Sequence, residues 1–221
     1  MALNKISKVG RKVKIKKIKS SSGVEEFTDI IPSEIILTII LNSNPISVIS
    51  CSPDNLIELA IGYLLNNGYV NTYSDINLLK ICNRDINNII NRNDFFISID
   101  IKANTSAQNN PDNVKVLPKF VSSACGSIDE LILSKSIISI KSKLKIKSEN
   151  ILKMNFENTK RQTYKKEFGG LHSAALFSAD GSIAAIAEDI GRHNCIDKLA
   201  GRVAIMKIKT DDKVIFTTGR L

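Results

Sequence analysis

Cysteine is scarce in this sequence of 221 residues, and tryptophan is absent. The cysteines stand far apart and form no Cys-x-x-Cys pair, which argues against a zinc ribbon and against a small disulfide-bonded scaffold. We therefore predict a reduced, cytoplasmic protein that holds no metal ion. The four cysteines are Cys51, Cys82, Cys125 and Cys195.

Long apolar runs are also missing. No stretch of about 18 apolar residues is present to cross a bilayer, and the best candidate, residues 30–41, is interrupted by Pro32 and Glu34. The basic amino terminus leads into alternating valine, isoleucine and lysine instead of the continuous apolar segment of a secretory signal. These absences predict a protein without a signal peptide and without a membrane partner.

Acidic residues are absent from the first 19 positions, which hold eight basic residues. Lysine and arginine exceed aspartate and glutamate by 31 − 22 = 9 over the chain, and without those eight they number 23 against 22. The positive charge therefore belongs to a basic arm, residues 1–25, and the near-neutral body predicts no nucleic-acid partner. The alternation of Val13 and Ile15 favours a solvated edge strand, and contact with an anion is the alternative.

Hydrophobic residues make up 43% of the chain, which is enough for one or two globular domains with a core. Residues 35–49 show two β-rich runs around a turn. A helix follows, with Ser52 or Asp54 as its predicted cap and Gly68 as its end. The polar, turn-rich stretch 101–118 then predicts a boundary between a small α/β domain, residues 26–118, and a second domain, residues 119–221.

Cys125 precedes a predicted helix. Ser127, followed three residues later by Glu130 and an apolar run, forms a capping box, so we expect the helix to begin at Ile128. Backbone amides and the helix dipole stabilise a thiolate at such a position, although the neighbouring acids oppose this. The sequence therefore favours Cys125 as the reactive cysteine, with a buried structural thiol as the alternative. The other three are weaker candidates, namely Cys195 at the start of a later predicted helix, and Cys51 and Cys82 beside apolar segments.

A β-hairpin is predicted around Asp180 and Gly181, because Asp-Gly between two apolar runs is a strong hairpin pattern. A two-residue loop there sets His172 opposite Asp189 and Ser173 opposite Glu188. The open end of the hairpin would then gather a histidine and two carboxylates. A cross-strand histidine and carboxylate can be an ordinary surface pair, but their convergence with other polar groups favours a functional site.

The stretch EDIGRHNCIDKLAG predicts a strand, a glycine loop and a helix whose N-cap is Asn194. A further strand over residues 213–218 completes a strand–helix–strand unit, in which the two strands are expected to be parallel. Their carboxyl ends then fall on one edge of the sheet, where α/β folds bind ligands. Arginines, glycines and a helix amino terminus at that edge predict a phosphate or pyrophosphate site.

The segments GGLHSAAL, EDIGRHNCIDKLAG and TTGR, in this order, resemble the FdhD family of formate dehydrogenase accessory sulfurtransferases. The earlier segment ILNSNPISVISCSPDNLIELAIGYLLNNGYV is similar to the family's amino-terminal part. The resemblance implies an α/β fold in which a cytidine-deaminase-like three-layer α/β/α domain follows a small α/β domain. It further implies a cytoplasmic homodimer that takes persulfide sulfur from a cysteine desulfurase. That sulfur would pass to the bis-guanine-dinucleotide molybdenum cofactor of formate dehydrogenase.

The resemblance also implies roles for single residues. The persulfide would form on Cys125, because VSSACG matches the family's cysteine loop. The diphosphate or guanine end of the cofactor would meet the glycine loop and the end of the last strand. The implied cofactor-binding residues are His172, Gly191, Arg192, His193, Asn194, Thr218, Gly219 and Arg220.

Three departures from the family pattern leave alternatives open. Ile128 stands where the family commonly has a second loop cysteine, and Phe168 replaces a threonine before the double glycine. The family also continues beyond the position of Leu221, so we expect this chain to be less stable and to bind cofactor more weakly than a longer version. A non-catalytic molybdenum-cofactor-binding chaperone is therefore the alternative function. A zinc deaminase is disfavoured, because the His-x-Glu and Pro-Cys-x-x-Cys ligands are missing.

Overall fold

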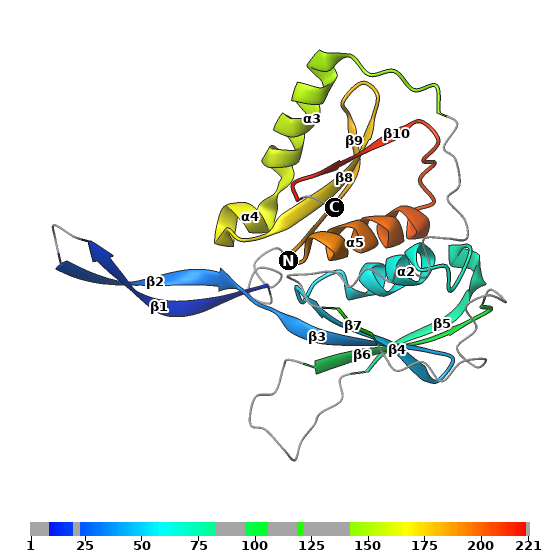
Figure 1. The fold of residues 1–221 in the computed structure, drawn as a ribbon, viewed down its shortest axis with the longest axis horizontal. Helices are drawn as coiled ribbons and strands as arrows, with labels where there is room; N and C mark the ends of the chain where they lie inside the picture. Colours follow the sequence, from blue (N-terminus) through cyan, green and yellow to red (C-terminus); the bar gives the residue numbers. More distant parts are fainter. Residues whose placement is uncertain (1–8, 20–22, 83–95, 106–118, 122–141, 220–221) are drawn as a thin grey trace.

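The structure is a computed structural model that describes residues 9–19, 23–82, 96–105, 119–121 and 142–219. Its described elements form a two-stranded ribbon, a five-stranded sheet, a three-stranded sheet and the helices that pack against them (Figure 1). This is the mixed α/β architecture that the sequence predicts. The division into domains at residue 118 stays a prediction.

The ribbon consists of β1 (Gly10–Lys19) and β2 (Gly23–Pro32), which pair antiparallel along their whole length. It stands away from the body of the molecule (Figure 1). The alternating residues of the basic arm therefore form a strand, as predicted, and we call the two strands together the ribbon.

The five-stranded sheet has the order β5-β6-β3-β4-β7. Its central hairpin turns at Asn42 and Ser43, whose φ angles of 49° and 75° place both in the left-handed region. The predicted hairpin is thus confirmed. Alternate residues of the central strands point to one face, where α2 (Leu56–Asn66) covers them. The strands are β3 (Ile35–Leu41), β4 (Asn44–Cys51), β5 (Ile76–Cys82), β6 (Phe96–Ala103) and β7 (Lys119–Val121), with a short 3-10 turn, η1 (Tyr73–Asp75), before β5.

The three-stranded sheet has the order β10-β8-β9 and is covered on both faces. One face packs through Ala174 and Leu176 against Cys195 and Leu199 of α5. The other face packs through Phe177 against α3 and its Met154. The elements are α3 (Ser148–Arg161), α4 (Thr163–Phe168), β8 (His172–Ser178), β9 (Ile183–Asp189), α5 (Arg192–Ile205) and β10 (Lys213–Thr217).

Helices α2 and α5 lie against each other between the two sheets (Figure 1). Their closest approach is made at two glycines. A methyl group added to Gly62 would overlap the carbonyl oxygen of Asp197, and one added to Gly201 would overlap the carbonyl oxygen of Glu58. The absence of side chains at these two positions lets the two backbones touch, and this contact joins the amino-terminal half to the carboxyl-terminal half.

Two details of the second half differ from the sequence prediction. Strands β9 and β10 run in the same direction, but both pair antiparallel with β8, which lies between them. Helix α5 begins at Arg192 with Gly191 as its N-cap, so the predicted cap, Asn194, is already the third helical residue. The reason is that the Asn194 side chain bonds to other segments instead of to the helix amides.

Candidate functional site

The candidate site lies at one edge of the three-stranded sheet, where β8 begins and where β9 and β10 end. The register pairs His172 with Asp189 and Ser173 with Glu188, as the sequence predicts. The connecting turn is one residue longer than predicted, and a bulge between Leu176 and Phe177 restores the expected pairs.

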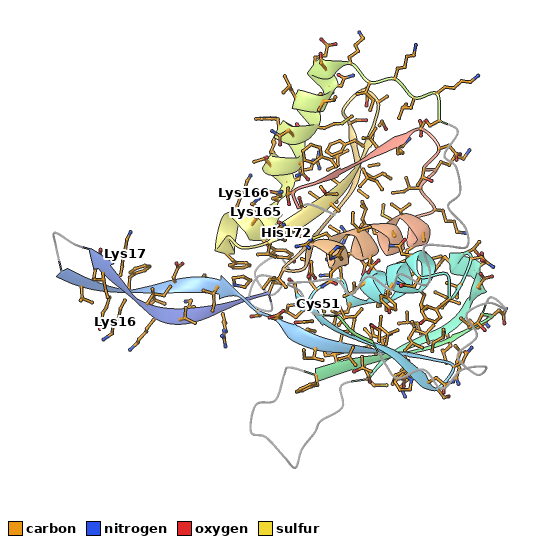
Figure 2. The ribbon with its side chains drawn as sticks, in the orientation of Figure 1. Lys16, Lys17, Cys51, Lys165, Lys166 and His172 are labelled. Atoms are coloured by element: carbon orange, nitrogen blue, oxygen red, sulfur yellow. The ribbon has the colours of Figure 1, made fainter. Side chains whose placement is uncertain are left out.

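His172, Arg192 and Gly219 meet at this edge, although they come from three different elements. A methyl group on Gly219 would lie 3.0 Å from the Cβ of Arg192 and 3.1 Å from the Nδ1 of His172. Only a glycine leaves this space open without displacing its neighbours. Figure 2 shows His172 at the start of β8, next to α4. The structure therefore brings together three predicted residues, which are His172 at the start of β8, Gly219 just after β10 and Arg192 at the start of α5.

Arg192 is the first residue of α5 and is half-buried. Its Nε is buried and has no hydrogen-bond partner among the described residues. The first helical hydrogen bond of α5 runs from the amide of Cys195 to the carbonyl of Gly191, at 3.2 Å. The amides ahead of Cys195 have no earlier turn to bond, and the helix dipole adds partial positive charge there. An anion is the ligand that these donors suit.

His193, the next residue, is half-buried beside this arginine. Burial and the positive charge of Arg192 both lower its pKa below the ordinary value of 6.5. Its imidazole is therefore neutral at neutral pH in the absence of an anion. A bound anion would reverse part of this effect by offsetting the charge of Arg192.

The side chains of two predicted ligand-binding residues, Asn194 and Thr218, form hydrogen bonds with other parts of the protein. Asn194 is buried, and its Nδ2 donates to the carbonyl of Ser50 at 2.8 Å and to Asp189 Oδ1 at 2.9 Å. The Thr218 hydroxyl accepts the amide of Ser173 at 2.9 Å. These contacts hold the two side chains in the walls of the site.

A buried charge network supports the glycine loop, and the sequence reasoning missed it. The ammonium of Lys198, which is 0% exposed, lies 2.6 Å from Asp189 Oδ2 and 2.8 Å from Asp54 Oδ1. Asp189 also accepts the amides of Ser52 at 3.1 Å and Gly191 at 2.7 Å. Both carboxylate oxygens of Asp189 are therefore occupied, and the loop is fixed to the segment between β4 and α2. We call Lys198, Asp189 and Asp54 the charge network.

The charged groups in this network shift one another's pKa values. Burial alone would lower the pKa of Lys198, but Asp189 and Asp54 outweigh burial and raise it, so the ammonium stays protonated. Burial raises the pKa of Asp54, although Lys198 opposes the shift. Burial, together with Asp54, raises the pKa of the Tyr164 hydroxyl to about 12. Helix α4, which carries Tyr164, is thereby linked to the same network.

Glu188 has a structural contact of its own. The sequence places it at the open end of the hairpin, and the structure shows its carboxylate accepting the backbone amides of Thr163, Tyr164 and Lys165 at 2.8 to 3.1 Å. It thus caps the amino terminus of α4. Burial raises its pKa in spite of these three donors.

Two of the cysteines that the structure describes, Cys51 and Cys195, are poor nucleophiles. Burial raises the pKa values of Cys51 and Cys195 above the ordinary thiol value, so both are protonated at neutral pH. Cys51 ends β4 inside the core (Figure 2), and Cys82 is half-buried. Cys125, its predicted capping box and Arg220 lie outside the described residues, and strand β7 is described up to Val121, four positions before Cys125.

The described ranges contain no group of three or more histidine, cysteine or acidic side chains placed to hold a metal ion. Among the described helices, none has the length and apolar character that crossing a bilayer requires. The convergence at the sheet edge instead offers a cationic side chain, helix amides and open space beside a glycine. Chemically, this arrangement can bind a phosphate or another compact anion.

Comparison with known proteins places the chain in a family. Residues 32–221 match the model of the FdhD/NarQ family. The chain is 30% identical over 210 residues to "Sulfur carrier protein FdhD" of Geobacillus kaustophilus, covering 94% of this chain and 74% of that protein. It is also 30% identical over 176 residues to the protein of the same name from Saccharolobus solfataricus, covering 79% of this chain. This protein belongs to the FdhD/NarQ family.

A solved structure shares the fold. The crystal structure of a putative formate dehydrogenase accessory protein from Desulfotalea psychrophila superposes with a TM-score of 0.71. The alignment covers 96% of this chain and 76% of that one, at 19% sequence identity. The chain spans 62% of the length of the Saccharolobus solfataricus relative.

Proposed function

We propose that this protein is a sulfur carrier that accepts persulfide sulfur on Cys125 from a cysteine desulfurase. The sulfur then passes to the bis-guanine-dinucleotide molybdenum cofactor of formate dehydrogenase. The observation that supports this most strongly is the meeting of Arg192, His172 and Gly219 at the amino terminus of α5, within a chain of the FdhD/NarQ family. The names of its relatives, sulfur carrier protein and formate dehydrogenase accessory protein, agree with the proposal.

In the first step, the thiolate of Cys125 attacks the outer sulfur of the donor's cysteine persulfide. The sulfur–sulfur bond of the donor breaks, and its electron pair leaves with the donor's cysteine as a thiolate. A new sulfur–sulfur bond forms on Cys125, and the transferred sulfur keeps its oxidation state. No oxidant or reductant is needed for this exchange.

The cofactor enters as the substrate of the second step, and its ends carry guanine and diphosphate. The site suits a diphosphate, because Arg192 holds a buried Nε without a partner among the described residues and because the amides at the start of α5 favour an anion. Arg192 and His193 would contact the phosphates, while Gly219 leaves room beside His172. Asn194 and Thr218 would hold the walls of the site in place.

The finer predictions from the resemblance belong to the same proposal. The three-stranded sheet with helices on both faces agrees with a cytidine-deaminase-like α/β/α layer arrangement. We propose that this part corresponds to that domain and that the protein works as a homodimer in the cytoplasm. Sedimentation at micromolar concentration, with a mass of one chain at every concentration, would rule out the dimer.

Sulfur loading is tested by intact mass after incubation with a cysteine desulfurase and cysteine. The expected result is one added sulfur in the wild type, its loss in Cys125→Ala, and its retention in Cys82→Ala, a matched control at a half-buried thiol. Sulfur that appears equally on Cys125→Ala would contradict the proposal.

Cofactor binding is tested by calorimetry with GDP, which has the guanine and diphosphate of the cofactor's ends. Arg192→Ala is expected to weaken binding by about 1.5–3 kcal/mol, the range for a lost charged hydrogen bond. Arg161→Ala, an exposed arginine on α3 that pairs with Glu157, is the control and is expected to leave the affinity unchanged. Equal affinities of the wild type and a folded Arg192→Ala variant would remove the phosphate assignment.

A non-catalytic cofactor-binding chaperone remains the second candidate. It is favoured by Ile128 at the second cysteine position. That function predicts GDP binding without any sulfur loading. The two experiments above therefore separate the candidates.

A further inference from the structure

The ribbon is exposed along most of its length. Ile18 is 80% exposed and Val24 is 61% exposed, and the two lie opposite each other near its tip. Figure 2 shows Lys16 and Lys17 far out on the ribbon, away from both sheets. An isolated two-stranded ribbon is marginally stable in water, because it lacks a third strand or a helix to cover it. Exposed apolar side chains in such an element indicate a surface that a partner covers.

Charge is distributed unevenly along the ribbon. Strand β1 holds six basic residues and no acid, whereas β2 holds three acids. The strand period places Lys12, Lys14 and Lys16 on one face, where Glu26 pairs with Lys16 at 2.8 Å. Lys12 and Lys14 face Ile30 and Thr28, which are uncharged. This face therefore presents unbalanced positive charge.

The opposite face of the ribbon places apolar side chains between the cations Arg11 and Lys17. Ile15 lies opposite Phe27, which is 40% exposed, and Val13 is the next residue of β1 on that face. Apolar and aromatic side chains ringed by cations match the composition of protein interfaces. The three acids of β2 lie among these cations and would repel a continuous polyanion such as a nucleic-acid backbone or an anionic membrane. The observations favour a protein with acidic groups around an apolar patch.

The base of the ribbon is fixed to the body beside the candidate site. Gly10 packs against the ring of Phe168 in α4, where a methyl group would come within 2.6 Å of it. Val9 is buried with Leu171, and its carbonyl accepts the amide of Ser33 at 2.6 Å. Helix α4 adds two exposed lysines, Lys165 and Lys166, and Figure 2 shows them near His172, on the side from which the ribbon leaves. The basic surface thus extends from the ribbon toward the site.

We propose that the ribbon and the lysines of α4 form the docking surface for the sulfur-donor protein, which presents acidic groups around an apolar patch. This inference rests on the proposed function, because only there does sulfur arrive on another protein's cysteine. The sulfur acceptor is a small cofactor that the sheet edge suits, so the donor is the partner that needs a protein surface. Charge steering and an apolar contact at the ribbon would bring its persulfide to the side of the molecule that holds the site.

The test measures binding of the cysteine desulfurase by calorimetry at two salt concentrations. A ribbon variant, Lys12→Gln with Lys14→Gln and Lys17→Gln, is expected to lose about tenfold in affinity and much of the salt dependence. A control variant with the same net charge, Lys143→Gln with Lys145→Gln and Lys209→Gln, removes exposed lysines away from the ribbon and is expected to bind as the wild type does. A Phe27→Ser variant tests the apolar contribution separately, with a loss of several-fold expected.

The docking surface is overturned if both triple variants lose affinity equally, if the ribbon variant loses none, or if the wild type does not bind the desulfurase. It is also overturned if the ribbon binds a DNA duplex or anionic vesicles but not the desulfurase. Loading Cys125 with a small-molecule polysulfide, followed by intact mass, reports on the carrier function without any docking. Polysulfide loading that succeeds while the ribbon has no effect leaves the proposed function standing, and loading that fails in every chain removes the function itself.

Discussion

Two lysine–carboxylate pairs in this protein have nearly the same geometry and opposite surroundings. Lys198 lies 2.6 Å from Asp189 with both side chains 0% exposed. Lys16 lies 2.8 Å from Glu26 on the ribbon, with the two side chains 71% and 64% exposed. Distance alone therefore says little about what a pair contributes, because water screens the second pair and is excluded from the first.

The buried pair also links more of the molecule. Through Asp189 and Asp54, the charge network connects the end of β9, the start of α5 and the segment between β4 and α2. The ribbon pair connects two strands that are already paired through their backbones. A buried charge is costly unless each of its partners is present. The network therefore stabilises one arrangement of these three segments, because any other would leave a charge buried without a partner.

Lys198→Met is expected to cause the largest loss of stability, about 3–5 kcal/mol in the free energy of unfolding, because it leaves two carboxylates buried without their cation. Urea denaturation at pH 7 measures it. The double variant Lys198→Met with Asp54→Leu removes one of these carboxylates and is expected to recover part of the loss. A single variant as stable as the wild type would show that water reaches the network.

Gly62→Ala is expected to rank second, with a loss of about 1–3 kcal/mol, because the added methyl group overlaps the carbonyl oxygen of Asp197 on α5. Gly201→Ala is expected to behave in the same way against Glu58. In a solvated helix the same change would add about 1 kcal/mol of stability. The sign of the change in urea midpoint therefore decides whether α2 and α5 touch as described.

Local patterns were sufficient for much of the fold. The β3–β4 hairpin follows from two β-rich runs around a turn. The Asp-Gly turn predicts the β8–β9 hairpin, but His172 pairs with Asp189 only because a bulge offsets a turn that is one residue longer than predicted. The pairing of β10 with β8 did not follow, because a strand–helix–strand pattern sets only the direction of its strands and leaves open what lies between them.

The candidate site was predictable only in part, because the same residue types serve local and distant partners. Ser52 and Asp54 have the pattern of helix caps, yet the Ser52 hydroxyl accepts the amide of Ile190 at 3.0 Å and Asp54 binds Lys198. Asn194 likewise has the pattern of an N-cap but bonds to Ser50, 144 positions earlier in the sequence. Partners so far apart leave no local pattern, so Lys198 was indistinguishable from a surface lysine.

His193 lies between the two extremes of exposure and provides a pH-dependent test. Its pKa is below 6.5 in the folded protein, so the unfolded chain binds its proton first as the pH falls, and stability from this group is lost below pH 6.5. Under the proposed function, a bound diphosphate would raise that pKa, so GDP affinity is expected to rise as the pH falls from about 8 to 6. The gain is up to about tenfold for each pKa unit by which the ligand shifts the imidazole.

The terminal phosphate of GDP also titrates near pH 6. The pH dependence of GDP affinity in the wild type is therefore compared with that in a His193→Gln variant. His193→Gln keeps a polar side chain without a titratable ring, and it is expected to lose the protein's share of the pH dependence. Calorimetry in two buffers of different ionisation enthalpy measures the proton uptake directly. Equal proton uptake by both chains would place the phosphate away from His193.

Lys16→Met is expected to have the smallest effect, a loss of at most about 1 kcal/mol, although it is the same substitution as Lys198→Met in a pair of almost equal length. Here the carboxylate that remains, Glu26, is solvated, so no uncompensated buried charge results. The effect should shrink further at high salt, since the Debye length falls from about 10 Å at 0.1 M to about 3 Å at 1 M, whereas the loss in Lys198→Met should persist. Urea denaturation of the two variants at both salt concentrations gives all four values. A salt-independent loss above about 2 kcal/mol in Lys16→Met would mean that the ribbon is already covered in solution, as it would be if it packed against a second copy of the chain.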